Sequence, residues 1–309
     1  MSTTALDPAA FPTAETTVRG FRQVFTHLGA GGVPLLLVHG WPETRRLYWK
    51  VIGPLAEAGF EVIAPDLRGF GDSDVGPDGF HDVPSHSWDL HALCSSLGHE
   101  RVVALGGDLG GPVVQDLALR FPGFVDRLVL CNSPLPYDKV RMAGMQSRPP
   151  IEAADYFLRQ GTDADALAAE LRTPDERRRY VATFYTSRFW AHPGAFTGAG
   201  EVDFHTEPFA DAAKLRASFG AYESTFSEGA RSEAPLLGRN DETPTCILFG
   251  PSDHVLYPDF DRMAAEVFPR HVGPFLLRDC GHFVPWEAPG ALLGAVRSFC
   301  ADLLGRVPA

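Results

Sequence analysis

The stretch RVVALGGDLGGPV, Arg101–Val113, leads an apolar run into a carboxylate that is flanked by glycines. The apolar residues 102–105 are few and end at a glycine, which predicts a buried strand. From Gly110 onward apolar residues recur with helical spacing, so Asp108 falls in the turn between strand and helix. Glycines two positions to either side permit close backbone approach and a strained conformation at Asp108. The pattern is that of a nucleophile elbow with aspartate in place of serine, although a loop aspartate that caps the helix would look the same.

Length and composition indicate a globular protein. At 309 residues, with 45% hydrophobic and 21% charged residues, the chain suits one large α/β domain with an insertion or two small domains. The formal net charge of −12 argues against nucleic acid or an anionic membrane as a partner. No apolar run approaches the roughly 20 residues of a membrane span, and residues 1–17 lack a signal-peptide pattern, so we expect a cytoplasmic protein. Five scattered cysteines suggest neither disulfides nor a zinc site.

Strand-like and helix-like stretches alternate in the first part of the chain. The expected strands are 17–27 (one strand or a pair), 35–38, 60–65, 102–105 and 125–131, and the expected helices are 43–58, 83–97 and the segment from 110 onward. This alternation implies a mostly parallel, doubly wound sheet with active residues at the carboxyl ends of its strands.

The alternation stops near residue 135. Up to about residue 235 only helix-like segments occur, at 153–157, 164–171, 175–190 and 210–227. Afterwards a strand at 246–249, a helix at 257–267, a strand at 274–277 and a helix at 289–304 resume the α/β pattern. We therefore predict a core of 1–134 and 240–309, with a helical cap at 135–239 inserted after the sixth strand. Such a cap is expected to cover the carboxyl edge of the sheet.

Two polar residues follow the last two expected strands. Asp253 comes after strand 246–249, and His282 after strand 274–277. With Asp108 they give the order nucleophile, acid, histidine that α/β-hydrolase folds use. His254 adjoins the acid and is expected to have a surface role instead.

Four short motifs carry a resemblance to a known family. They are His39–Pro42 (HGWP), Asp66–Ser73 (DLRGFGDS), Gly106–Gly111 (GGDLGG) and the pair Gly281-His282. Together they resemble the epoxide hydrolase branch of the α/β-hydrolase fold, which also includes haloalkane and haloacetate dehalogenases. The similarity spans roughly 20–134 and 240–305. One departure is Gly107, where the family usually has histidine, but it removes no catalytic group.

The resemblance implies a mechanism that the residue types can support. Asp108 attacks a carbon to form an alkyl-enzyme ester, and His282, oriented by Asp253, activates the water that hydrolyses it. The backbone N–H groups of Trp41 and Leu109 are the expected oxyanion hole. The side chain of Trp41 is either a core aromatic or a substrate contact, and Trp190 is a second candidate contact.

An epoxide oxygen needs an acidic hydroxyl as it leaves. The resemblance implies two cap tyrosines in this role, for which Tyr222 and Tyr156 are the candidates and Tyr185 is a rival of Tyr156. The predicted reaction is therefore hydrolysis of an epoxide to a vicinal diol, on a small-molecule substrate and without a cofactor, by a monomer or homodimer. Metal binding is not expected, because His81, His86 and His91 are spaced by five and would lie on different faces of a helix.

Two alternatives remain. A dehalogenase would use the same nucleophile, but Leu109 stands where haloalkane dehalogenases usually have tryptophan, and residues 110–115 contain no arginine for a haloacetate. Trp190 keeps the halide possibility open. A non-catalytic protein that binds a small ligand is the third hypothesis, and it has no need of Asp, Asp and His at three strand ends.

Overall fold

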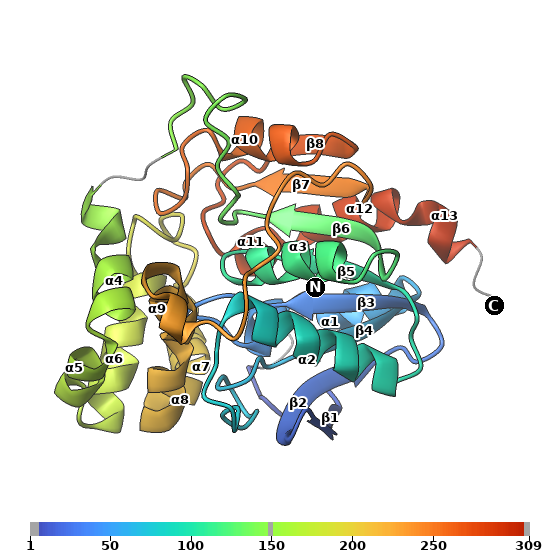
Figure 1. Ribbon diagram of the computed structural model, residues 1–309. Coiled ribbons are helices and arrows are strands. Elements are labelled where there is room, and N and C mark those ends of the chain that lie inside the picture. The colour runs from blue at the N-terminus through green and yellow to red at the C-terminus, as the bar shows by residue number, and fades with distance from the viewer. Residues whose placement is uncertain (1–5, 148–150, 306–309) are drawn as a thin grey trace.

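One sheet forms the centre of the molecule. The computed structural model describes residues 6–147 and 151–305, and within them eight strands pair in the order β1-β2-β4-β3-β5-β6-β7-β8 (Figure 1). The strands are β1 Thr13–Val18, β2 Phe21–Leu28, β3 Val33–Val38, β4 Phe60–Pro65, β5 Val102–Gly106, β6 Val125–Cys131, β7 Thr245–Phe249 and β8 His271–Leu276. Only the β1–β2 and β2–β4 pairs are antiparallel. The predicted mostly parallel sheet is confirmed, and the stretch 17–27 proves to belong to a strand pair.

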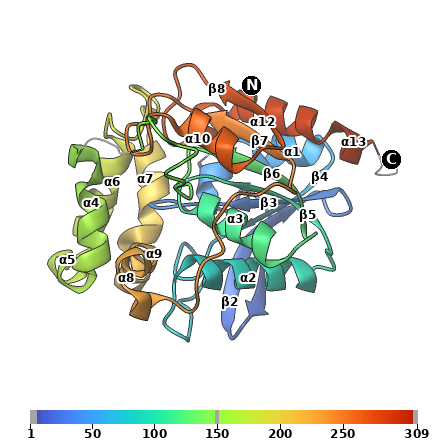
Figure 2. The same cartoon turned by 45° about the horizontal axis from the view of Figure 1, so that its top comes forward.

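Helices cover both faces of the sheet, which explains why its inner strands are apolar throughout. In Figures 1 and 2, α2 and α3 lie on one face, and α1 and α12 lie on the other. The helices of this layer are α1 Ile52–Glu57, α2 Val83–Ser96, α3 Gly110–Arg120, α10 Phe260–Val267, α11 Val284–Glu287, α12 Pro289–Phe299 and α13 Ala301–Leu304. α10 packs against β7 and β8 at the edge of the sheet.

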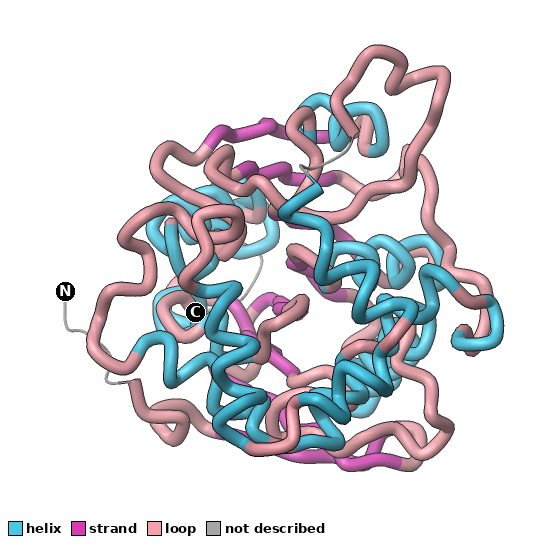
Figure 3. Tube along the Cα trace, turned by 90° about the vertical axis from the view of Figure 1, so that its left-hand side faces the viewer, coloured by secondary structure: helices cyan, strands magenta, loops and turns pink. Residues whose placement is uncertain are grey.

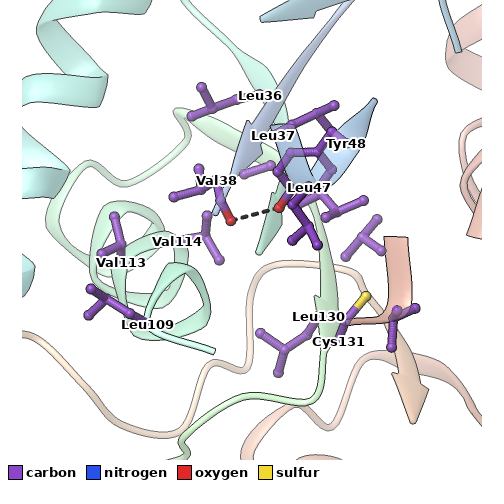
Figure 4. Packing of buried hydrophobic residues seen from close by; sticks show 14 of the residues in the cluster. Leu36, Leu37, Val38, Leu47, Tyr48, Leu109, Val113, Val114, Leu130 and Cys131 are labelled. Carbon is purple, nitrogen blue, oxygen red and sulfur yellow. Dashed lines mark hydrogen bonds between the residues drawn. The ribbon is translucent and has the colours of Figure 1, made fainter. Parts of the chain in front are cut away.

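Buried side chains hold the ends of β3 and β6 close to the start of α3 (Figure 4). Val113 and Val114 of α3 are fully buried beside Leu130 at the end of β6. The buried Tyr48 hydroxyl donates a hydrogen bond of 2.7 Å to the carbonyl of Val38, the last residue of β3. The carboxyl edge of the sheet is therefore closely packed around β3, β6 and the start of α3.

A group of helices lies between β6 and β7 in the chain, and we call it the helical insertion. Its elements are α4 Ile151–Thr162, α5 Ala164–Glu170, α6 Pro174–Tyr185, α7 Glu201–Thr206, η2 Glu207–Ala210, α8 Ala212–Ser218, α9 Gly220–Phe226 and η3 Glu228–Ala230. These elements lie on the side of the sheet toward which the arrows of β6 and β7 point, and they face the viewer in Figure 3. The limits 135–239 and the covering role of a cap stay predictions.

Three predicted helices are broken. The helix expected at 289–304 divides at Cys300 into α12 and α13. The helix expected at 43–58 is a 3-10 turn, η1 (Arg45–Tyr48), followed by the short α1. The Glu43 side chain accepts from the Gly40 N–H, and Thr44 is extended and caps the 3-10 turn by accepting from the Arg46 N–H, so the first helical turn begins only at Arg45. The helix expected at 210–227 divides into α8 and α9, which meet at Gly220. α7 was not predicted.

Candidate active site

Asp108 occupies a strained turn between β5 and α3. Its φ is +44°, a left-handed conformation that costs a non-glycine residue free energy. The flanking glycines are required sterically, since a Cβ on Gly110 would lie 2.2 Å from the carbonyl oxygen of Val38, and one on Gly106 would lie 2.4 Å from that of Gly110. The Asp108 N–H donates to the carbonyl of Asn132 over 2.8 Å. The turn expected from the sequence is present.

The two oxygens of the Asp108 carboxylate have different surroundings. Oδ1 accepts a hydrogen bond of 2.7 Å from the backbone N–H of Trp41. This approach needs a glycine before Trp41, because a Cβ on Gly40 would lie 2.5 Å from the Cβ of Asp108. Oδ2 lies 3.3 Å from Nε2 of His282. The N–H of Leu109, the other predicted oxyanion donor, has no acceptor within the described part of the chain.

His282 and Asp253 form a buried pair beside Asp108. Nδ1 of His282 lies 2.8 Å from Oδ2 of Asp253, and both side chains are fully buried. The other oxygen of Asp253 accepts from the backbone N–H groups of Val255 (2.8 Å) and Leu256 (3.3 Å). The fold thus brings together the three residues that the sequence analysis placed at separate strand ends.

The neighbouring carboxylates govern the charge of His282. Burial alone would lower its pKa, but the negative charges of Asp253 and Asp108, together with the hydrogen bond to Asp253, raise the pKa well above the ordinary value. Nε2 has no hydrogen-bond partner of good geometry among the described residues. This nitrogen is therefore in place to exchange a proton with a small molecule near Asp108.

Two tyrosines of the helical insertion meet near Asp108. The rings of Tyr156 (α4) and Tyr222 (α9) are 5.8 Å apart and nearly perpendicular. Burial is the largest cause that raises the pKa of both hydroxyls well above the ordinary value, and the negative charge of Asp108 adds to it, so both stay protonated. The hydroxyl of Tyr185, the rival of Tyr156, instead donates to the carbonyl of Pro42 over 2.5 Å.

A cavity of about 530 Å³ joins these groups. Asp108, Tyr156 and Tyr222 all belong to its wall, which is otherwise mainly apolar. The remaining lining residues are Asp82, Val83, Pro84, Leu109, Pro112, Pro134, Phe157, Ala221, Ser224, Thr225, Arg231, Pro235, Leu237, Val255, Leu256 and Tyr257. The volume and composition suit an apolar small molecule whose polar centre lies between the carboxylate and the two hydroxyls.

Sequence comparison places the chain in a family. Residues 33–289 match the family described as alpha/beta hydrolase fold. The chain belongs to this family. A soluble epoxide hydrolase from Corynebacterium sp. (strain C12) is 28% identical to this α/β hydrolase over 294 residues, which cover 94% of this chain and 97% of that protein.

Two further relatives extend the comparison. The bifunctional epoxide hydrolase 2 of Sus scrofa is 26% identical over 94% of this chain, and this chain spans 55% of the pig protein. Among solved structures, the epoxide hydrolase CorEH without ligand is similar with a TM-score of 0.80 and 27% identity, over 94% of this chain and 99% of that chain.

Asn132 is a site residue of this α/β hydrolase that the sequence analysis missed. Its Nδ2 donates to Oδ2 of Asp253 (2.9 Å) and to the carbonyl of Gly250 (3.0 Å), while its Oδ1 accepts from the Gly250 N–H (2.8 Å). It joins the turn after β6 to the turn that carries the acid. The sequence contained one signal for it, because Asn132 is a polar residue directly after a buried strand.

Glu43 is a second missed residue. It is buried and accepts a hydrogen bond from the Gly40 N–H, next to the residue that binds Asp108. Burial and the negative charge of Asp108 raise the pKa of Glu43 to about 8. The signal was its place in the stretch that follows β3, directly after His39–Pro42.

The two predicted tryptophans pack against residues of the site. The Trp41 indole stacks on Tyr156 (5.6 Å, 7°), and its Nε1 donates to the hydroxyl of Ser218 over 3.0 Å. The Trp190 ring lies 4.5 Å from His282 and 5.2 Å from Tyr156. Neither is among the described residues that line the cavity, so their role as substrate contacts stays a prediction.

Asp66, Asp74 and His254 have contacts or exposure that fit structural roles. Asp66 accepts from the backbone N–H groups of Arg45 (2.9 Å) and Asp72 (2.8 Å) and pairs with the Arg45 guanidinium. Asp74 pairs with Arg22 at 3.2 Å. The side chain of His254 is exposed, consistent with its expected surface role.

Residues 6–147 and 151–305 contain neither a metal-ligand cluster nor a membrane-spanning helix. No group of three His, Cys, Asp or Glu side chains there is arranged to hold a metal ion. None of the helices in these ranges has the length and apolarity needed to span a membrane. The five cysteines are free thiols and all are buried.

Proposed function

We propose that this α/β hydrolase converts an epoxide to a vicinal diol through a covalent ester on Asp108. The arrangement that carries the proposal is a carboxylate at an elbow, with a histidine–aspartate pair on one side and two protonated tyrosines at the same cavity. The likeness to proteins named epoxide hydrolases over nearly the whole chain supports it.

The first step forms the ester. Oδ2 of Asp108 attacks one ring carbon of the epoxide, the carbon–oxygen bond of the ring breaks, and the departing oxygen takes a proton from Tyr156 or Tyr222. Their raised pKa values keep these hydroxyls protonated until the alkoxide develops. Oδ1 stays bound to the Trp41 N–H and leaves Oδ2 as the nucleophile.

The second step hydrolyses the ester. Nε2 of His282 removes a proton from water, and the resulting hydroxide adds to the carboxyl carbon of Asp108. The negative charge that develops on Oδ1 is stabilised by the Trp41 N–H already bound there, with the Leu109 N–H as the second proposed donor. When this intermediate collapses, the bond between the carboxyl carbon and the substrate oxygen breaks, and the leaving alkoxide takes the proton of the added hydroxyl to give the diol and restore the Asp108 carboxylate. His282 then passes its proton to the tyrosine oxygen. The balance is one epoxide plus one water to one diol.

Isotope labelling under single-turnover conditions tests the covalent route. With enzyme in excess over an apolar epoxide in ¹⁸O-water, the first diol should be unlabelled, because its new oxygen comes from Asp108. The label should enter Asp108 and appear in the diol only in later turnovers. As a control, His282→Gln should accumulate the ester, detected as the substrate mass added to the peptide that contains Asp108. Solvent label in the first-turnover diol would contradict the proposal.

A dehalogenase reaction finds less support. A halide leaving group needs N–H donors that point at it, and the Trp41 indole N–H is already bonded to Ser218. The Trp190 indole remains as the other candidate donor. Halide release from a panel of haloalkanes, with no diol from any epoxide, would favour the dehalogenase over our proposal.

A further inference from the structure

A short segment of the helical insertion binds the loops that carry both Asp253 and His282. We call it the strap, residues 189–192, which lies between α6 and α7. The carbonyl of Phe189 accepts from the N–H of His254, and the carbonyl of Trp190 accepts from the N–H of His282, each over 2.8 Å. His282 itself and the residue that follows Asp253 are thus attached to the insertion through their backbone N–H groups.

Glu287 of α11 binds the strap and the histidine loop at once. Its Oε2 accepts from the N–H groups of Gly281 (2.8 Å) and His192 (2.9 Å), and its Oε1 accepts from the N–H of Phe283 (2.9 Å). The residues before and after His282 are therefore held by one carboxylate. No cation forms an ion pair with Glu287 within 6–147 and 151–305, so backbone N–H groups are its specific partners.

The strap and the histidine loop lie in close contact. A Cβ on Gly281 would lie 2.5 Å from the carbonyl oxygen of Trp190 and 2.7 Å from the nitrogen of His192. The His192 side chain also contacts the acid loop, with Nδ1 3.0 Å from the hydroxyl of Ser252. The close approach of Gly281 to Trp190 and His192 leaves no room for the histidine loop to shift toward the strap.

We infer that Glu287 is a positioning residue for His282, and that it acts by binding the histidine loop to the strap. The bond to Asp253 restrains the histidine ring through Nδ1, but the backbone of residues 281–283 decides where Nε2 lies relative to Asp108. An error of about 1 Å in such a position can slow a reaction by ~10²-fold. The inference rests on the proposed function, in which His282 acts as a base only in the second step.

The two steps should therefore respond differently to changes at Glu287. In Glu287→Ala we expect the ester to form at a rate within a few-fold of the unchanged protein, and to hydrolyse about 10- to 100-fold more slowly. Glu287→Gln keeps one acceptor oxygen for Gly281 and His192 but loses the bond to Phe283, so its loss should be smaller. Rapid acid quenching, followed by mass spectrometry of the Asp108 peptide, measures both rates.

Asp211→Asn is the matched control. Asp211 is a carboxylate of the insertion that also accepts two backbone N–H bonds, from Ala213 and Lys214, away from the histidine loop. Its variant should hydrolyse the ester at the unchanged rate. Circular dichroism and thermal unfolding report folding, and Glu287→Gln gives the result if Glu287→Ala does not fold.

The outcomes separate this inference from the proposed function. Slow ester hydrolysis with normal ester formation in the Glu287 variants supports the positioning role. Ester hydrolysis at the unchanged rate in both variants, or an equal loss in both steps, overturns it. Absence of any ester in the unchanged protein and in His282→Gln would instead overturn the proposed function.

Discussion

The Asp108 carboxylate has to serve two steps with different demands. As a nucleophile it must be ionised, and its charge then helps to keep a proton on His282. Once it is esterified the charge is gone, and one of the causes that raise the pKa of His282 disappears with it. The histidine therefore releases its proton more readily at the stage when a base is needed.

The raised pKa of His282 predicts that the rate of ester hydrolysis depends on pH. The pKa of His282 is raised above its ordinary value, so the protonated form persists to higher pH, and only the neutral form accepts a proton from water. Ester hydrolysis should therefore accelerate as pH rises through the pKa that His282 has in the ester. Decay of ester formed in a rapid pulse, followed across a pH series, measures this rate. A rate that falls with rising pH would contradict the assignment of the base.

The hydroxyls of Tyr156 and Tyr222 give a second prediction. The double variant Tyr156→Phe, Tyr222→Phe should lose about 10²- to 10⁴-fold in the rate of ester formation, the usual contribution of a general acid. Each single variant should lose less, because the other hydroxyl remains. Tyr185→Phe is the control, since its hydroxyl binds the carbonyl of Pro42. Retained ring opening in the double variant would show that another group is the acid.

Among the elements, the junction of β5 and α3 depends on glycine at two positions. Gly110→Ala would bring a Cβ to 2.2 Å from the Val38 carbonyl oxygen, so β3 or α3 must shift. We expect a loss of about 1 to 3 kcal/mol in the free energy of unfolding, as for other overpacked sites, together with lost activity. Urea unfolding measures it.

Gly294→Ala is the matched control for this change. Gly294 lies in α12, is exposed, and has no atom within 4 Å of an added Cβ. Alanine there should stabilise the protein by up to about 1 kcal/mol, because it favours helix. Equal effects of the two substitutions would show that the tight junction does not matter.

The buried His205 links the helical insertion to the core. His205 of α7 stacks on Tyr185 and lies 4.3 Å from the Trp286 ring of α11. Neither ring nitrogen has a partner among the described residues. Burial, assisted by the positive charges of Arg46 and Lys50, lowers the pKa of His205 from 6.5 to about 3.

Acid should therefore weaken this contact. Above pH 6.5 the histidine is neutral in both the folded and unfolded states, so its contribution to stability is fully present. As pH falls below 6.5 only the unfolded chain takes up the proton, so this histidine lowers the free energy of unfolding by up to about 1.4 kcal/mol per pH unit until pH 3 is approached. His205→Phe removes this term and should flatten the fall between pH 6.5 and 4.5, as measured by urea midpoints. A parallel fall in both proteins would show that His205 does not contribute.

The local pattern of the sequence was enough for much of this molecule. Short uninterrupted apolar runs, separated along the chain by helix-like segments, predicted the mostly parallel sheet, because strands buried on both faces are apolar throughout. Glycines around Asp108 predicted the strained turn, because the backbone conformations that a residue can adopt are limited by its own side chain and glycine has none. Asp253 and His282 were placed by their order after strands, because parallel strands end at one edge.

Contacts between distant residues were beyond such patterns, and only the tertiary structure decided them. The hydroxyl of Tyr185 meets Pro42 across 143 residues, and Asn132 meets Gly250 across 118. A Cβ added to Gly220 would lie 2.7 Å from the Cβ of His81. Gly220 stands at the junction of two helices that were predicted as one. Glu287 binds backbone N–H groups, which carry no mark in the sequence. Local periodicity sets the elements and the strand ends, whereas the packing of the insertion on the sheet selects which side chains meet there.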